Sequence, residues 1–237
     1  MSLHRIDDTA ILLPLGISLW GSVAYLLMPA LWRRRSREHP GLADAQRVVT
    51  TAAGIPGDPI NLGLIGREED VAVAMNAAGW FPADPITLRS SLGIVGSALL
   101  HRPYPTAPVS NLFLFGRRED LAFEKPVGND ARLRHHVRFW RSALLDREGR
   151  PLWVGAATFD RSVGFSHTTG QVTHHIEADV DKERDGLLDD LEKAGCSARR
   201  GRIEDFHRDR EGRNGGGDPW RTDGMLALAV LRPPRPS

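Results

Sequence analysis

Cysteine is almost absent from this chain of 237 residues, and the one cysteine, Cys196, has no second cysteine to pair with. An intrachain disulfide and a CxxC-type zinc or redox site are therefore excluded. A net charge of one sign is missing too, because 31 basic and 30 acidic residues leave a formal charge of +1. The chain has no overall field to attract nucleic acid, and we expect no nucleic acid partner. Its content of 41% hydrophobic and 26% charged residues predicts a globular protein.

Short catalytic motifs are missing as well. No GxSxG elbow, Walker loop or HExxH motif occurs. Gly63, Gly66 and the run Gly215 to Gly217 do not match a dinucleotide fingerprint, so no cofactor-binding residues are assigned and any cofactor stays unknown. Lysine is scarce, with three lysines among 31 basic residues. We interpret this arginine bias as the codon usage of a GC-rich, bacterial genome.

A long uncharged segment stands near the N-terminus. From Ala10 to Trp32, 23 consecutive residues carry no charge, and as a helix they reach about 34 Å, enough to span a bilayer. The prolines and glycines within this segment are tolerated in membrane helices. A cleaved signal peptide is the alternative, since Ser22-Val23-Ala24 has small residues at a suitable spacing. The acidic start of the chain and the apolar residues after Ala24 favour an uncleaved transmembrane helix.

Basic residues follow this segment at once. The predicted membrane-interface residues are one aromatic residue and four arginines: Trp32, Arg33, Arg34, Arg35 and Arg37. Because the N-terminal flank is net acidic, the positive-inside rule places the rest of the chain in the cytoplasm. We expect a single-pass protein of the bacterial inner membrane. Its expected partners are membrane lipids, through the helix, and another membrane protein is a further candidate.

The remaining chain is predicted to form a connector and one soluble domain. Residues 1–9 are a short tail, 33–58 a basic juxtamembrane connector, 59–231 the domain and 232–237 a disordered tail. Within the domain, the pattern N-L-x-L-x-G-R-x-E-D occurs at residues 61–70 and again at 111–120. Each copy predicts a short buried strand that turns at its glycine. A partial duplication further predicts that both strands belong to the same sheet.

The spacing of apolar residues predicts the other elements. Helices are predicted at 71–78, 88–99 and 182–194. Asp181 is expected to cap the last helix and Gly195 to end it. An extended segment at 121–125, a hairpin of 133–140 with 152–159, and strands at 173–180 and 225–231 complete the pattern. The predicted fold class is α+β, a mixed β-sheet with helices packed on it, preceded by one transmembrane helix.

Polar side chains gather on two of these strands. Period two places His136 and Arg138 on one face of their strand, and His175, Glu177 and Asp179 on one face of another. If the two faces meet, they form a pocket. The candidate catalytic residues are His136, Arg138, Asp160, His175, Glu177 and Asp179, and the candidates for metal ligands are His136, His175 and Asp179.

Other interpretations of these residues stay open. Arg138 favours an anionic ligand over a metal, because a fixed cation repels a second cation. The alternative to any site is a hydrated sheet face with cross-strand ion pairs. Geometry can separate these cases: at least three of the candidates His136, Asp160, His175, Glu177 and Asp179 around one cavity would favour an enzyme.

Four segments carry a resemblance to a known family. Their sequences are ADPITLRSS at 83–91, RPYPTAP at 102–108, HHVRFW at 135–140 and HHIEADVD at 174–181. The stretch from Pro59 to Gly195 resembles the LssY C-terminal domain family of bacterial proteins. The resemblance implies a domain that can be fused to membrane parts, including type 2 phosphatidic acid phosphatase domains. It implies no catalytic residues.

Phosphatase chemistry does not carry over to this chain. Such phosphatases look like K-x6-R-P followed by P-S-G-H, but here Val95 stands at the lysine position before Arg102-Pro103, and P-S-G-H does not occur. The leading hypothesis is therefore a membrane-anchored accessory or interaction domain. The alternative is a hydrolase-like or metal-dependent enzyme that uses the His/Asp/Glu cluster.

Overall fold

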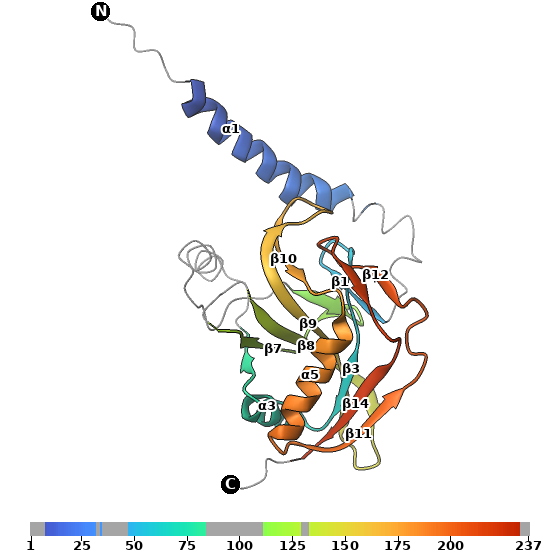
Figure 1. Cartoon of the computed structure of the whole chain (residues 1–237). Helices are drawn as coiled ribbons and strands as arrows, with labels where there is room; N and C mark the ends of the chain where they lie inside the picture. Colours follow the sequence, from blue (N-terminus) through green and yellow to red (C-terminus); the bar gives the residue numbers. More distant parts are fainter. Residues whose placement is uncertain (1–7, 32–33, 35–46, 84–110, 129–132, 233–237) are drawn as a thin grey trace, which may run out of the picture.

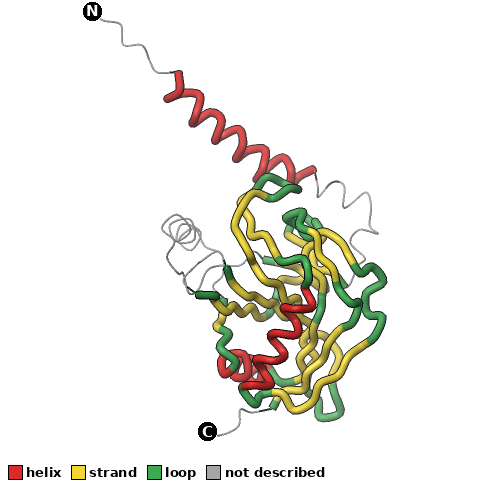
Figure 2. Tube along the Cα trace, in the orientation of Figure 1, coloured by secondary structure: helices red, strands yellow, loops and turns green. Residues whose placement is uncertain are grey.

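The computed structural model describes residues 8–31, 34, 47–83, 111–128 and 133–232. Strands and helices of the domain lie below one N-terminal helix (Figure 2), which is the predicted α+β class. Several predictions fall outside the described residues. They are the helix at 88–99, the segment 102–108 and the interface residues Trp32, Arg33, Arg35 and Arg37.

The N-terminal helix consists of α1 (Asp8–Ser22), the wider π-helical turn η1 (Val23–Leu27) and a last turn that reaches Leu31. By length and composition, Leu12–Leu31 could cross a membrane. Pro29 has no N–H to bond the carbonyl of Tyr25 four residues earlier, which accounts for the widened turn. The helix extends away from the domain with its second half above β10 (Figure 1).

The largest sheet has the strand order β11-β14-β3-β9-β8-β7-β4, and β10 also pairs with β9. Its strands are β3 (Leu62–Ile65), β4 (Phe81–Pro82), β7 (Leu121–Pro126), β8 (Arg134–Leu145), β9 (Pro151–Phe165), β10 (Val172–Ile176), β11 (Ser197–Ile203) and β14 (Leu226–Leu231). β14 and β3 run parallel, whereas the other neighbours run antiparallel. The predicted hairpin is confirmed as β8 and β9, and the extended segment at 121–125 as β7.

Strand β9 organises this sheet because it is long. One of its edges pairs with β8, while the other is shared by β3, opposite residues 152–155, and β10, opposite residues 160–165. Asn61 fills the gap between β3 and β10. Its side chain accepts a hydrogen bond from the Ala157 N–H and donates to the carbonyls of Ala157 and Val180. This asparagine of the repeated pattern is thus a buried structural residue with satisfied polar groups.

Helices α3 (Glu68–Ala77) and α5 (Val180–Lys193) cover one face of the sheet (Figure 1). The predicted apolar stripes are buried there: Val71, Ala74 and Met75 of α3, and Leu187, Leu188 and Leu191 of α5. Gly79 and Gly195 follow the two helices with φ of +80° and +72°, which glycine adopts at little cost. Cys196 is buried in the same apolar cluster.

The capping prediction for α5 is wrong. The helix begins at Val180, two residues earlier than predicted, and Asp179 occupies the N-cap position. Asp181 therefore lies inside the first turn. Its carboxylate accepts hydrogen bonds from the Thr222 hydroxyl and the Asp223 N–H, and so ties the helix to the loop before β14.

A smaller sheet with the order β2-β1-β5-β6 faces the other side. Its strands are β1 (Val48–Thr51), β2 (Pro56–Pro59), β5 (Leu112–Leu114) and β6 (Arg117–Arg118). Val49, Leu112 and Leu114 pack there with Trp140 and Ala156 of the large sheet. Because β1 and β2 pair in this sheet, the domain begins before residue 59, and the predicted connector at 33–58 is too long.

The prediction that both copies of the repeated pattern lie in one sheet is wrong. β3 belongs to the large sheet and β5 to the small one. The two glycines also do different things. A Cβ on Gly66 would come within 3.2 Å of Leu231, so this glycine permits close packing, whereas Gly116 has φ of +72° and turns the chain into β6. The two similar segments therefore lie in different tertiary environments, one in the large sheet and one in the small sheet.

The C-terminal part closes the domain. β12 (Glu211–Arg213) and β13 (Pro219–Arg221) form a two-stranded ribbon. The predicted strand at 225–231 is confirmed as β14. Arg232, assigned to the tail by the sequence, belongs to the domain, since its N–H and its Nε donate to the carbonyls of Cys196 and Gly195.

Candidate binding pocket

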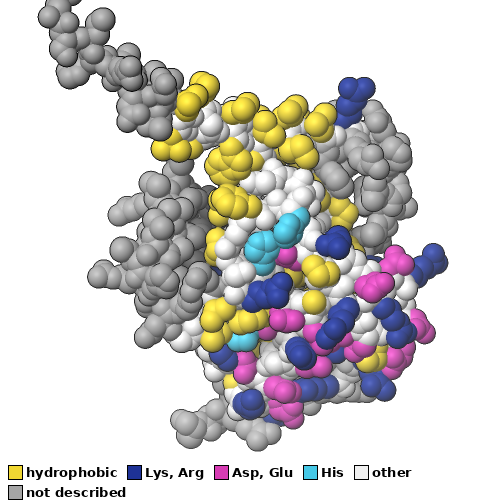
Figure 3. Space-filling view, turned by 45° about the horizontal axis from the view of Figure 1, so that its top comes forward, with side chains coloured by type: hydrophobic (Ala, Val, Ile, Leu, Met, Phe, Trp, Pro, Cys, Tyr) yellow, Lys and Arg dark blue, Asp and Glu magenta, His cyan; other side chains and the backbone are white. Residues whose placement is uncertain are grey.

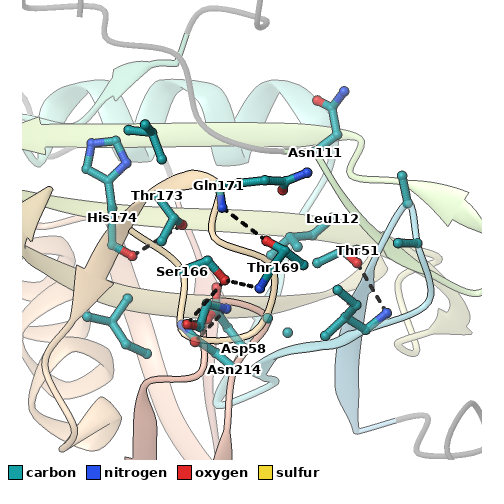
Figure 4. A pocket seen from close by; sticks show the side chains of 18 of the residues that line it. Thr51, Asp58, Asn111, Leu112, Ser166, Thr169, Gln171, Thr173, His174 and Asn214 are labelled. Atoms are coloured by element: carbon teal, nitrogen blue, oxygen red, sulfur yellow. Dashed lines mark hydrogen bonds between the residues drawn. The ribbon is translucent and has the colours of Figure 1, made fainter. Parts of the chain in front are cut away.

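A cavity of about 340 Å³ lies at the end of the domain next to the N-terminal helix. Tyr25 and Pro29 of the helix form part of its wall. The rest comes from the β1–β2 region, the β9–β10 loop and the turn at 214–216. In Figure 4, Ser166, Thr169 and Gln171 of the loop lie between His174 on one side and Leu112 with Thr51 on the other. Segments far apart in the sequence therefore meet around one space.

Strand β8 supplies three polar side chains to this cavity. Arg134, His136 and Arg138 line it, while Val137 and Phe139 point into the apolar cluster under the helices. This confirms the predicted period of two and the shared face of His136 and Arg138. Asp160 of β9 joins them and is fully buried.

Arg134 is held by two carboxylates. Its Nε donates to Asp160 Oδ2 at 2.9 Å and its Nη1 to Glu124 Oε2 at 3.2 Å. Glu124 is 2% exposed and Arg134 is 3% exposed, so the pairing takes place away from solvent. A buried guanidinium with two carboxylates is well compensated, and replacing either carboxylate would remove a charge-assisted hydrogen bond from a site without solvent.

Two pKa shifts follow from this burial. Burial alone would raise the pKa of Asp160, but His136, His174 and Arg134 outweigh it and hold that pKa well below its usual range. Burial lowers the pKa of His174 to about 4, against the opposing effect of Asp160. At neutral pH the cavity therefore contains an ionised Asp160 and a neutral His174.

Arg138 differs from Arg134 because its charge is poorly matched. It is 4% exposed, and its closest ion-pair partner among the described residues is Asp58, with Nη1 and Oδ2 separated by 3.6 Å. Among these residues, its Nε and Nη1 have no hydrogen-bond partner. Burial lowers the pKa of Arg138, although Asp58, Glu119 and Asp160 oppose the shift. An arginine stays charged nonetheless, so the cavity is lined by a buried cation that keeps unused donors within the described part of the chain.

His136 links two other residues in an order that resembles a catalytic triad. Its Nε2 lies 2.6 Å from the Thr158 hydroxyl, and its Nδ1 lies 3.2 Å from Asp160 Oδ1, although this second contact lacks hydrogen-bond geometry. Thr158 is fully buried and does not line the cavity. A nucleophile must reach its substrate. The contact between Thr158 and His136 joins two neighbouring strands inside the domain, and it does not present the Thr158 hydroxyl to the cavity.

The prediction that His175, Glu177 and Asp179 reach the same pocket is wrong, because none of them lines the cavity. Glu177 accepts a hydrogen bond from the Ala178 N–H, and Asp179 pairs with Arg221 at 3.2 Å. β10 ends at Ile176 after an irregularity in register, so period two does not extend to 177 and 179. His175 lies instead near His167 and Asp218.

Among the arginine, histidine and aspartate residues that line the cavity, sequence reasoning missed Arg134, His174 and Asp58. The sequence contained the information for Arg134, because residues 134, 136 and 138 alternate along one strand and therefore share a face. His174 was missed because its face was assigned to the apolar core. Ile176 on that face is buried as expected, but the same buried face also borders the cavity. Of the five residues whose grouping would favour an enzyme, His136 and Asp160 line the cavity.

A comparison with protein families bears on the whole domain. The family described as LssY C-terminus matches residues 42–226. This chain belongs to the LssY C-terminus family. The match starts shortly before β1, in agreement with a domain that begins before residue 59. Comparisons of this LssY C-terminus protein with curated proteins and with solved structures found no match.

Proposed function

We propose that this LssY C-terminus protein is a membrane-anchored binding module whose cavity holds the phosphate-bearing polar group of a membrane lipid. The observation that carries the proposal is Arg138, a buried guanidinium that lines a cavity partly walled by an apolar helix and whose Nε and Nη1 have no hydrogen-bond partner among the described residues. A guanidinium fork matches the oxygens of a phosphate. A phosphate would supply the acceptors that Nε and Nη1 lack in the described residues.

The other cavity residues define what kind of phosphate compound fits. Asp58 and Asp160 also line the cavity, so a bare anion would meet two carboxylates as well as Arg138. A ligand that combines a phosphate with hydroxyl or ammonium groups would match this lining. Its phosphate would accept hydrogen bonds from Arg138, and its hydroxyl or ammonium groups would donate to Asp58. Ser166, Thr169 and Gln171 add neutral hydrogen-bonding groups. Phospholipid headgroups have this combination.

The loop between β9 and β10 ties the cavity to the helix. The Trp20 Nε1 donates to the Gly170 carbonyl at 3.2 Å, the Gln171 Nε2 to the Ala24 carbonyl at 3.0 Å, and the Val172 N–H to the Tyr25 hydroxyl at 3.2 Å. These contacts satisfy the backbone groups of Gly170 and Val172 beside the loop and of Ala24 in the helix.

The surface around this loop supports a position at the bilayer. Phe165 and Val172 flank the loop and are 62% and 49% exposed. Figure 3 shows hydrophobic side chains gathered along the helix and just below it, while charged side chains cover the opposite part of the domain. Tyr25 and Pro29, the two helix residues in the cavity wall, lie in the C-terminal half of Leu12–Leu31, and Pro29 is close to its end. The cavity would then open where headgroups lie.

Ligand binding can be tested with Arg138→Gln in the full chain, purified in detergent. Glycerol 3-phosphate should raise the melting temperature of the wild type by several degrees, because a ligand at about 100 times its Kd adds about 2.7 kcal/mol. The rise should be lost in Arg138→Gln. Arg202→Gln is the matched control, since Arg202 is 67% exposed and pairs only with Glu204 among the described residues.

A second measurement separates a lipid from a soluble phosphate compound. Native mass spectrometry of wild-type protein extracted from membranes should show about one bound phospholipid per chain, and Arg138→Gln should show none. A thermal shift with glycerol 3-phosphate but no retained lipid would assign the cavity to a soluble ligand. An equal shift in wild type and Arg138→Gln would contradict the proposed site.

We propose further that the helix anchors the protein in a bacterial inner membrane with the domain on the cytoplasmic side. The basis is the arginine run after Trp32, opposite an acidic N-terminal flank. A C-terminal alkaline phosphatase fusion should then be inactive, whereas a green fluorescent protein fusion should fluoresce. The reverse pattern would place the domain in the periplasm.

A further inference from the structure

Three side chains from separate segments converge outside the cavity. His167 lies in the loop between β9 and β10, His175 on β10, and Asp218 just before β13. One ligand atom of each lies within 4.8 Å of the others. His167 is exposed, His175 is partly buried and Asp218 is 3% exposed. The cluster is therefore open to solvent on one side and anchored in the domain on the other.

Asp218 is fixed by its surroundings. Its Oδ2 accepts a hydrogen bond from the Ile176 N–H at 3.2 Å, and its own N–H donates to Asn214 Oδ1 at 3.0 Å. Its Oδ1 lies 2.7 Å from His175 Nδ1. Orientation of ligand groups by such hydrogen bonds is a regular property of protein metal sites.

The backbone around the two imidazoles leaves room for them. A Cβ on Gly164 would come within 2.6 Å of His175 Nε2, and a Cβ on Gly217 within 2.8 Å of His167 Cβ. Gly217 also has φ of +89°, which a side chain would disfavour. The His167 N–H donates to the Gly216 carbonyl at 2.8 Å, which fixes the start of the loop. Both histidines are therefore positioned by glycines.

Two imidazoles and one carboxylate are a donor set for zinc and related transition metals. Tetrahedral zinc with bonds of about 2.0–2.1 Å needs donor atoms roughly 3.3 Å apart, which side chains within 4.8 Å reach by small rotations. The metal would replace the proton that joins His175 Nδ1 to Asp218, because metal ligands bind in their deprotonated form. A fourth position would remain for water.

We propose that His167, His175 and Asp218 form a binding site for one divalent transition metal ion, with Zn²⁺ as the probe. The metal would join the loop, β10 and the segment before β13. Since Ser166, Thr169 and Gln171 of the same loop line the cavity, the metal would stiffen one wall of the cavity. The site uses none of the lipid-binding residues and stands independently of the proposed function.

The test uses the full chain in detergent, without a polyhistidine tag and after treatment with a chelator. Isothermal titration calorimetry with ZnCl₂ should give one site per chain, and Zn²⁺ should raise the melting temperature. His167→Ala should weaken binding more than tenfold while the protein stays folded, because His167 is exposed in a loop. His167→Cys, which restores a zinc ligand, should recover binding.

The matched control is Thr168→Ala, one residue further along the same loop, which should bind Zn²⁺ as the wild type does. Arg138→Gln should also bind Zn²⁺ normally, so failure of the lipid site and failure of the metal site give different results. No binding to the wild type, or equal affinity in wild type and His167→Ala, would overturn the assignment.

Discussion

The two faces of the large sheet have opposite chemistry, although the same strands build both. Under α3 and α5, Val137 and Phe139 of β8 join a cluster of apolar side chains. On the other face, Arg134, His136 and Arg138 of the same strand border a cavity. The first face stabilises the domain by burying apolar area, and the second depends on the pairing of buried charges. Under the proposed function, stability and binding would depend on different side chains of one strand.

The largest loss of stability should come from the helix-covered face. Phe139→Ala should lower the free energy of unfolding by about 3–5 kcal/mol, because it leaves a cavity in a packed core. Phe139 is fully buried and packs against Gly155, where a Cβ would come within 2.7 Å of its ring. Urea titration followed by tryptophan fluorescence measures the change.

Val73→Ala is the control for this substitution, since Val73 is 50% exposed on the same side of the molecule and its loss should cost less than about 0.5 kcal/mol. A loss below about 1 kcal/mol for Phe139→Ala would mean that this face is not the main source of stability.

A smaller loss, which depends on pH, is expected on the cavity face. Asp160→Asn should destabilise the domain by about 3 kcal/mol at pH 7, because Arg134 loses one of its two carboxylates. The pKa of Asp160 is lowered in the folded state. Its contribution is therefore complete above the unfolded pKa of about 3.9 and declines as the pH falls below that value.

Urea unfolding of the wild type and of Asp160→Asn at pH 7 and at pH 3 measures this dependence. The difference between them should shrink by about 1 kcal/mol at pH 3 relative to pH 7. A difference that stays constant, or grows, at low pH would contradict an ionised Asp160 in the folded protein.

An effect on stability smaller than that of Asp160→Asn is expected at Arg138, the residue on which the proposed binding depends. Arg138→Gln should change the free energy of unfolding by less than about 1 kcal/mol, because the substitution removes a buried charge that has few partners. The same urea titration applies. A loss as large as that of Asp160→Asn would show that Arg138 is a structural residue like Arg134, and the contrast between the two arginines would disappear.

Much of this fold could be predicted from the sequence where a regular spacing of apolar residues extends over a whole helix or strand. The stripes of α3 and α5, the β8–β9 hairpin and the alternation along β8 follow from local spacing alone. The sheet assignments of β3 and β5 could not, because strand pairing is decided by distant partners. The same holds for β1, whose partner β5 lies more than fifty residues away.

The site was harder to predict than the fold. Arg138, His136 and Asp160 could be selected because polar residues stood out on apolar strands. The choice between His174 and His175 depended on which face of β10 borders a cavity, and no local pattern contains that information. Asp58 enters from β2, far away in the sequence, and Tyr25 from the helix. A cavity is formed by surfaces that meet only after folding.

Under the proposed membrane anchoring, the participation of Tyr25 and Pro29 in the cavity wall would make the bilayer a structural component of the site. A membrane helix adjusts its tilt to the thickness of the surrounding hydrocarbon, at a cost of fractions of a kcal/mol per Å of mismatch. Any such tilt would move Tyr25 relative to the β9–β10 loop and thus change the mouth of the cavity. Lipid composition would then act on this protein twice, as the source of a ligand and as the force that sets the shape of its binding site.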